Sequence, residues 1–305
     1  MLLALVGPTA SGKTEAALAI AETLAAEIVS VDSMLVYRGM DVGTAKPTAE
    51  ERARVPHHLI DLAEPSEPFS VARYQELGRA SLAGITRRGS RPILVGGSGL
   101  YFRALVDELE FPGTDAATRA ELQLEAAAVG ATGLHRRLAF ADPAAAAKIE
   151  PGNVRRTVRA LEVAAITGRE FSSFAEAWER YPAGRVRAAG IELPREALVA
   201  RVEARARAML DRGFLDEVRE LRARGLGRWL TSTQAIGYAE MAAHLEGRST
   251  LEDAVTETVT RTKSLARRQM AWFRRDPRIR WFTAGQEGAV ARVDDILEHL
   301  EGGWS

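Results

Sequence analysis

The sequence of 305 residues contains no cysteine. Disulfide bonds, catalysis by a thiol and zinc sites built on cysteine are therefore excluded. The sequence also lacks any run of the roughly 20 apolar residues that a membrane-spanning helix needs. A glycine-rich motif begins at Gly7 after one short strand, so we expect no signal peptide. We therefore expect a cytoplasmic protein with no membrane partner.

The formal net charge is zero, because 41 basic side chains balance 41 acidic ones, but the charges are unevenly placed. Between residues 261 and 280, eight Lys or Arg side chains face only Asp276, which gives a local charge of +7. Trp272 and Phe273 lie among these charges and Trp281 and Phe282 follow directly, so the segment suits a polyanion whose bases can stack. Taken alone, the pattern favours a solvated helix face over a packed aromatic core.

The most informative motif is a glycine-rich loop after an apolar run, residues 2–6, that is typical of a buried strand. The loop matches the phosphate-binding pattern G-x-x-x-x-G-K-[ST] at every fixed position. Residues 15–26 are rich in Ala, Leu and Glu and predict a helix directly after it. This arrangement turns backbone N–H groups toward one point, where a di- or triphosphate can bind. The predicted binding residues are Gly7, Pro8, Thr9, Ala10, Ser11, Gly12, Lys13 and Thr14.

Two side chains of the loop have separate expected roles. The Lys13 ammonium would add a point charge beside the terminal phosphates, and the Thr14 hydroxyl would bind Mg²⁺. The loop predicts the ligand but does not identify the reaction.

Short apolar runs alternate with helical stretches in the first part of the chain. Runs at 28–31 and 93–95 end in Asp32-Ser33 and in the turn 96–99. This alternation is typical of a parallel sheet with crossover helices, in which ligands bind at the carboxyl ends of the strands. We predict an α/β fold, a P-loop-type parallel sheet with flanking helices, in which the three polar turns share one rim.

An all-helical insertion is predicted to interrupt this sheet. Phe111-Pro112-Gly113 breaks the alternation, and helix-forming residues dominate from 115 to 178. Residues 188–193 predict a strand that returns to the sheet, followed by long amphipathic helices. The predicted units are 1–112 with 188–305 for the core and 113–187 for the helical insertion.

Asp32 follows a predicted strand beside the phosphate loop, where a carboxylate could hold Mg²⁺ through water or act as a general base. The polar segment 32–47 that follows contains Gly, Pro and cationic residues and is typical of a substrate-binding loop. An ordinary surface connection is the alternative for this segment.

Several segments together resemble the tRNA dimethylallyltransferases, the bacterial tRNA isopentenyltransferases. They are the glycine loop, segment 32–47 with its Met-Asp-Val-Gly-Thr-Ala-Lys-Pro ending, and segments 57–61 and 95–101. Residues 159–163, residues 235–238 and the Arg268-Gln269 pair with Trp272-Phe273 agree, so the resemblance extends from Gly7 to about Phe282.

The resemblance implies a reaction in which a dimethylallyl group passes from dimethylallyl diphosphate to the exocyclic amine of the adenosine 3′ of a tRNA anticodon. Diphosphate would be released, and Mg²⁺ would be the cofactor. The general-base role falls on Asp32, and Thr9, Lys13 and Arg205 would surround the diphosphate as catalytic residues. Arg201 and Arg207 look like Arg205 from sequence. We expect the protein to act as a monomer on the anticodon stem-loop, with the insertion 113–187 in contact with the tRNA.

The target adenine must leave the stack of the anticodon loop, and contacts with the extruded base must offset that cost. Some of the residues implied to contact tRNA have structural alternatives. Tyr101 could be a core aromatic behind the glycine turn, and the arginines near 155–159 could form a helix face paired with Glu162. Leu35 stands where many members of the family carry Gln. The implied tRNA contacts are Asp32, Ser33, Met34, Leu35, Ser98, Tyr101, Arg155, Arg156, Arg159 and Gln269.

Two other functions compete with this interpretation. A P-loop kinase of a nucleoside or small metabolite explains the glycine loop and Asp32 equally well, but it explains segment 32–47 poorly. An RNA-binding or GTP-dependent switch protein would need a base-reading motif of the Asn-Lys-x-Asp type, which we do not find.

Overall fold

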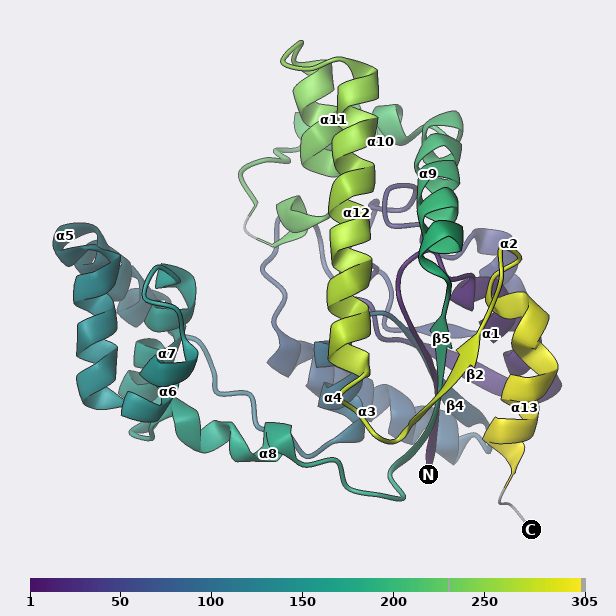
Figure 1. The fold of residues 1–305 in the computed structure, drawn as a ribbon, viewed down its shortest axis with the longest axis horizontal. Helices are drawn as coiled ribbons and strands as arrows, with labels where there is room; N and C mark the ends of the chain where they lie inside the picture. The colour runs from purple at the N-terminus through teal and green to yellow at the C-terminus, as the bar shows by residue number, and fades with distance from the viewer. Residues whose placement is uncertain (230, 303–305) are drawn as a thin grey trace. The chain divides into compact units, whose positions relative to one another are not determined.

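A computed structural model describes residues 1–229 and 231–302, and Figure 1 shows their arrangement. The contacts divide the chain into one unit of Met1–Asp107 with Pro182–Ser305 and a second unit of Glu108–Tyr181. These boundaries lie five and six residues before the predicted ones (108 against 113, and 182 against 188). The reason at the first boundary is that the carbonyls of Pro112 and Gly113 accept hydrogen bonds from Arg159, inside the second unit.

The first unit contains a sheet of six parallel strands in the order β3-β2-β4-β1-β5-β6, which confirms the predicted α/β class. Sequence patterns predicted four strands and missed two: β3 has only two residues, and β6 begins at the end of the arginine-rich window 261–280. The bounds are β1 (Leu2–Val6), β2 (Ala26–Ser30), β3 (His57–His58), β4 (Arg91–Gly96), β5 (Val186–Glu192) and β6 (Ile279–Thr283).

The helix after the glycine loop is shorter than predicted. Helix α1 (Lys13–Thr23) begins two residues earlier than residue 15 and ends three residues before residue 26. Ala25 adopts the left-handed conformation with φ of 49°, which turns the chain, and Ala26 already belongs to β2. The turn lets β2 start directly beneath the helix.

Helices cover both faces of the sheet. On one face, alternate strand residues such as Leu5, Ile93 and Ile191 pack against α1 and α13 (Val293–Glu301) in one apolar core. Figure 1 shows α3 (Val71–Arg87) and α4 (Gly99–Val106) beside the other face. Successive side chains of each strand point to opposite faces of the sheet, so each strand packs against both layers of helices.

A cluster of helices extends from the carboxyl ends of the strands (Figure 1). Helix α9 (Arg195–Asp211) follows β5, and α12 (Leu251–Phe273) leads into β6. Between them, α10 (Phe214–Ala223) and α11 (Tyr238–Leu245) pack on each other and on these two helices. The short α2 (Ala49–Arg54) precedes β3. In the described part of the chain, no helix combines the length and the apolar character needed to span a membrane.

The second unit is helical, with α5 (Ala116–Ala141), α6 (Pro143–Lys148), α7 (Val154–Thr167) and α8 (Glu176–Glu179). Leu134 and Leu138 of α5 pack against Val158 and Leu161 of α7 in a core of its own. Helix α5 breaks at Gly130, where φ is 73° and ψ is 168°.

A buried set of charges fastens the two points where the chain leaves and re-enters the first unit. Arg278 lies 2.7 Å from Oδ1 of Asp107 and 2.7 Å from Oδ2 of Asp276, and these side chains are almost inaccessible to solvent. Arg278 also donates to the carbonyl of Pro182 at 3.5 Å, and Arg103 pairs with Asp107. The carboxylates raise the pKa of Arg278 despite burial. This arginine is therefore not available to a polyanion, although it lies in the charged window 261–280 that would suit one.

We expect Asp107→Asn to lower the free energy of unfolding by about 3 kcal/mol or more, because it leaves buried guanidinium groups without a full counter-charge. Urea denaturation should show this, with Glu203→Gln, a neutralised exposed carboxylate on α9, as the control. Equal stabilities of the two variants would contradict the role of this cluster.

Candidate active site

Three polar turns meet at one edge of the sheet. The glycine loop follows β1, Asp32 follows β2, and Gly96-Gly97 ends β4, and these strands are neighbours in the order β2-β4-β1. All three turns line one cavity of about 520 Å³. The predicted shared rim is confirmed, because parallel strands present their carboxyl ends at the same edge.

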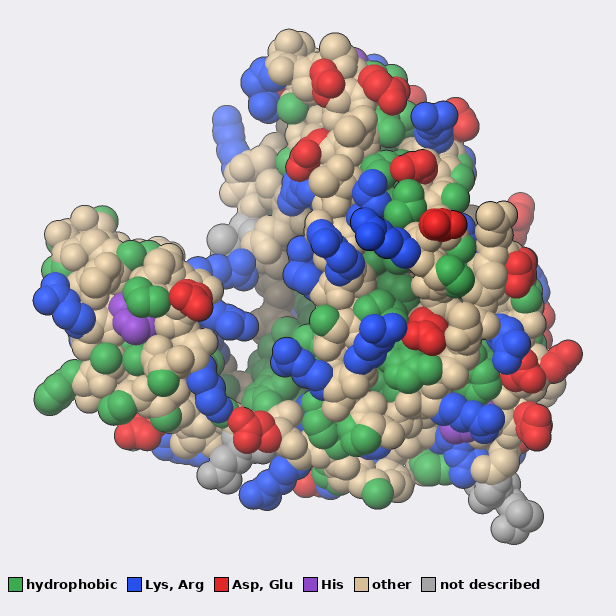
Figure 2. Space-filling view, in the orientation of Figure 1, with side chains coloured by type: hydrophobic (Ala, Val, Ile, Leu, Met, Phe, Trp, Pro, Cys, Tyr) green, Lys and Arg blue, Asp and Glu red, His purple; other side chains and the backbone are tan. Residues whose placement is uncertain are grey.

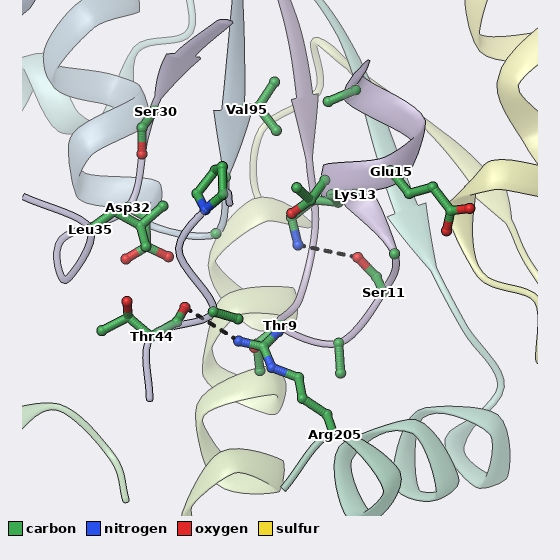
Figure 3. A pocket seen from close by; sticks show the side chains of 18 of the residues that line it. Thr9, Ser11, Lys13, Glu15, Ser30, Asp32, Leu35, Thr44, Val95 and Arg205 are labelled. Carbon is green, nitrogen blue, oxygen red and sulfur yellow. Dashed lines mark hydrogen bonds between the residues drawn. The ribbon is translucent and has the colours of Figure 1, made fainter. Parts of the chain in front are cut away.

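The glycine loop curls around the amino end of α1. Gly12 has φ of 81° and immediately precedes the helix, and a Cβ on Gly7 would lie 2.7 Å from the carbonyl oxygen of Ile191. The Lys13 ammonium crosses the loop and donates to the carbonyl of Pro8 at 2.5 Å and to Oγ of Ser11 at 3.1 Å. Figure 3 shows this crossing. The loop therefore has the form of an anion cradle at a helix terminus.

A second cavity, of about 710 Å³, adjoins the first. We call the first the loop cavity and the second the outer cavity. Helices α9 and α12 and the segment 233–236 form much of the outer wall. The residues that line both cavities are Thr9, Asp32, Thr44, Gly97, Arg205 and Gln269.

Asp32 is the carboxylate of this shared wall. Its Oδ1 accepts a hydrogen bond from the backbone N–H of Met34 at 2.8 Å, and in the described residues no donor reaches Oδ2. Burial lowers the pKa of both Lys13 and Arg205, and the charge of Asp32 offsets part of that lowering, so the three groups lie close to one another. Figure 3 shows their side chains around the same part of the loop cavity.

Burial works against both cations. It is the largest cause that lowers the pKa of Lys13 to about 7, and the nearby positive charge of Arg205 lowers it further. Burial also lowers the pKa of Arg205. One carboxylate therefore faces two poorly solvated cations, an arrangement that an incoming polyanion would stabilise.

Only one of three similar arginines on α9 is placed to contact an anion in both cavities. Arg201 donates to the carbonyls of Ala10 and Gln286, each at 2.7 Å, and so braces the glycine loop. Among the described residues, the guanidinium of Arg205 has a single long hydrogen bond, 3.5 Å, to the carbonyl of Thr44 (Figure 3). Arg207 is exposed and lines neither cavity.

Gln269 of α12 joins two of the turns. Its Oε1 accepts from the backbone N–H of Thr9 at 2.8 Å, and a Cβ on Gly97 would lie 2.3 Å from its Nε2. A larger residue at position 97 would therefore displace this amide. Gln269 was predicted to contact tRNA, but its carbonyl oxygen is already bonded to the phosphate loop.

The predicted tRNA contacts in the first unit fall in three places. Ser33, Met34 and Ser98 line the outer cavity, whereas Leu35 lines the loop cavity. Tyr101 is buried, its ring centroid lies 3.9 Å from that of Tyr74, and it lines neither cavity. Tyr101 is thus a core aromatic behind the glycine turn, the alternative that the sequence left open, and its contact with tRNA stays a prediction.

The predicted contacts in the second unit divide in a similar way. Arg155 and Arg156 are exposed at the start of α7. Arg159 donates to the carbonyls of Pro112 and Gly113 and to the buried carboxylate of Glu162. Arg159 therefore holds the second unit together, and the alternative of a pair with Glu162 is correct for this residue.

Sequence reasoning named neither Thr44 nor Arg261 as a site residue. Thr44 lines both cavities. It belongs to the predicted substrate-binding loop 32–47, so that motif could have identified it. Arg261 lines the outer cavity and pairs with the buried Glu240, whose Oε2 accepts from the N–H of Gly237 at 2.8 Å. Nothing in the local sequence links these residues, which only the helix packing brings together.

Two family models match this chain, and curated proteins that are similar to it carry names of the same kind. A model described as IPP transferase matches residues 35–276, and one described as isopentenyl transferase matches residues 1–65. The tRNA dimethylallyltransferase of Bifidobacterium animalis subsp. lactis is 47% identical over 99% of this chain and 88% of that protein. The same enzyme from Kineococcus radiotolerans is 49% identical over 93% and 90%.

Solved structures are also similar. The tRNA isopentenylpyrophosphate transferase of Bacillus halodurans is 40% identical, with a TM-score of 0.71 over 99% of this chain and 95% of that one. A eukaryotic dimethylallyltransferase acting on tRNA, at 24% identity and a TM-score of 0.79 over 94% of this chain and 74% of that one, shares the fold.

The lowered pKa of Lys13 predicts a pH dependence of anion binding. The ammonium loses its proton as pH rises through about 7, so affinity for inorganic diphosphate should fall by up to about tenfold per pH unit above that point. Lys13→Arg keeps its charge and should flatten the curve. Isothermal titration of both proteins isolates Lys13, because the ionisation of diphosphate is common to them; identical curves would exclude the effect.

The arginines of α9 provide a second test. Arg205→Ala should weaken diphosphate binding about tenfold or more, because a charge-assisted hydrogen bond contributes about 1.5–3 kcal/mol. The matched variant Arg207→Ala, on the same helix but outside the cavities, should bind as the unaltered protein does. A larger loss in Arg207→Ala would show that the anion binds elsewhere.

Proposed function

This chain belongs to the tRNA dimethylallyltransferase family, and we propose that it transfers a dimethylallyl group from dimethylallyl diphosphate to the exocyclic amine of the adenosine 3′ of a tRNA anticodon. The observation that carries the proposal is the position of Asp32, a carboxylate shared by a cavity with a phosphate cradle and a second cavity beside it. A kinase of a small metabolite is not favoured, because the similar proteins share nearly the whole chain and act on tRNA.

The donor would bind in the loop cavity. The N–H groups of the glycine loop, Lys13 and Arg205 would bind the diphosphate, and Thr9 would lie beside it. The allylic C–O bond breaks with its electron pair on the departing diphosphate, and positive charge is delocalised over the allyl group. Groups that stabilise the leaving anion therefore lower the barrier.

The acceptor would approach through the outer cavity, with Ser33, Met34 and Ser98 among its contacts. As the adenine nitrogen forms its bond to the allylic carbon, Asp32 takes one of its protons as general base. The N–H of Met34 holds Oδ1 of Asp32, which leaves Oδ2 for this proton. A neutral secondary amine and diphosphate result.

Mg²⁺ fits this site as a metal held together with the substrate. Among residues 1–229 and 231–302, no group of three or more His, Cys, Asp or Glu side chains could hold a metal without other ligands. Thr14 lines the loop cavity and is exposed, so its hydroxyl would be the protein ligand, with phosphate oxygens completing the set. The ion would neutralise developing charge on the diphosphate.

Basic side chains support the tRNA partner. Figure 2 shows Lys and Arg side chains gathered over α12, and Arg267 and Arg268 of this helix are exposed. Arg155 and Arg156 are exposed in the second unit. We propose that these groups bind phosphates of the anticodon stem-loop, which carries the sequence-independent part of the affinity. Both cavities are lined by one chain, which is consistent with action as a monomer.

The decisive experiment supplies radiolabelled dimethylallyl diphosphate and unmodified tRNA to the protein. We expect label in the tRNA and release of diphosphate. Consumption of ATP with unlabelled tRNA would instead support the kinase.

Asp32→Asn keeps the size of the side chain and removes the base. We expect turnover to fall by about 10²–10⁴-fold while the affinity for tRNA changes little, since a general base contributes about that much. Single-turnover rates and filter binding measure the two quantities. Turnover within a few fold of the unaltered enzyme would remove Asp32 from this role.

A further inference from the structure

A carboxylate outside both cavities holds the loop that leads to the site. The backbone N–H groups of Asp41 and Val42 donate to Oε2 of Glu217 at 2.8 and 2.7 Å. The N–H of Gly43 donates to Oε1 at 3.1 Å, and the hydroxyl of Tyr238 donates to the same oxygen at 2.7 Å. Four donors from two distant segments therefore converge on one side chain of α10.

The loop is pressed closely against the helices at this point. A Cβ on Gly43 would lie 2.2 Å from the ring of Phe214 and 2.7 Å from that of Tyr238. Only glycine permits the approach that brings the N–H groups of 41–43 within reach of the carboxylate. The Gly in the Met-Asp-Val-Gly-Thr-Ala-Lys-Pro segment thus has a physical reason.

The far end of the loop is fixed by a buried ammonium. Lys46 lies 2.7 Å from Oδ1 of Asp41 and 2.6 Å from Oδ1 of Asp61, and it donates to the carbonyl of Tyr37 at 2.6 Å. Glu217 therefore holds the start of the turn 41–46 and Lys46 holds its end. Thr44 lies between these two anchors.

Thr44 connects the loop to the reaction site. It lines both cavities, its Oγ1 donates to the carbonyl of Met40 at 2.6 Å, and its carbonyl accepts from Nη2 of Arg205 at 3.5 Å. That bond is the one hydrogen bond of the Arg205 guanidinium to the described residues. The direction of the guanidinium thus depends on where the Thr44 carbonyl lies.

We propose that Glu217 is a positioning residue for prenyl transfer: by binding the N–H groups of 41–43, it sets the Thr44 carbonyl and, through it, the Arg205 guanidinium. The inference rests on the proposed function but concerns a residue that touches neither substrate. A carboxylate suits the task, because it accepts several hydrogen bonds at once and each is charge-assisted. An amide in its place offers only one acceptor oxygen.

Hydrogen exchange tests the physical part of the proposal without any substrate. In Glu217→Gln, exchange at the amides of 41–43 should be faster than in the unaltered protein by about tenfold or more. Glu220→Gln, which neutralises an exposed carboxylate on the same helix, should exchange as the unaltered protein does. Unchanged protection of 41–43 in Glu217→Gln would overturn the proposal.

Kinetics test the consequence for Arg205. Glu217→Gln should raise KM for dimethylallyl diphosphate about tenfold and leave KM for tRNA nearly unchanged, whereas Glu220→Gln should change neither. In an Arg205→Ala background, Glu217→Gln should add little, because the group that it positions is gone. Additive effects in this double-mutant cycle would show a general structural role and overturn the proposal.

A second variant moves the loop while Glu217 stays intact. Gly43→Ala places a methyl group against Phe214 and Tyr238 and should raise the same KM. Thermal unfolding verifies that each variant is folded. Lack of prenyl transfer by the unaltered enzyme would refute the proposed function, whereas normal transfer with a silent Glu217→Gln would refute this inference alone.

Discussion

The electrostatic balance around Asp32 is the interaction on which the rest of the site depends. Lys13 and Arg205 are poorly solvated cations, and burial is the largest influence that lowers the pKa of each. Asp32 partly compensates them, and a bound diphosphate would complete the compensation. The site is therefore suited to a diphosphate leaving group. The two cations already point toward the position where negative charge develops, so they need little reorganisation during the reaction.

This balance needs a rigid frame, and the frame comes from distant parts of the chain. Arg201 braces the glycine loop from α9, and Gln269 braces it from α12, 260 residues away. Glu217 and Lys46 hold the loop that carries Thr44. Helices α9 and α12 thus hold the glycine loop, and α10 holds the segment 41–43. Residues of α9 and α12 line both the loop cavity and the outer cavity.

The second unit is also held together by a buried carboxylate. Glu162 is buried and accepts from Arg119, Arg159 and the N–H of Asp115, so one carboxylate ties α7 to the start of α5. In the first unit, Arg278 holds the residues on either side of the insertion, Asp107 and Pro182. Arg159, which the resemblance assigns to tRNA, and Arg278, which lies in the charged window, are therefore structural, and exposed arginines such as Arg155 and Arg268 carry the proposed contacts.

The sequence by itself determined the parallel sheet, the phosphate loop and the shared rim of the three turns. Strand periodicity and the glycine pattern are local, and neighbouring parallel strands must present their ends together. Only the tertiary structure decided the burial of Tyr101, the capture of Arg159 by Glu162, and the choice of Arg205 over Arg201 and Arg207. The local sequence around each of these residues is the same whether its side chain lies in a cavity, in the core or beside a carbonyl. Long-range packing selects among those environments, and no local pattern records that selection.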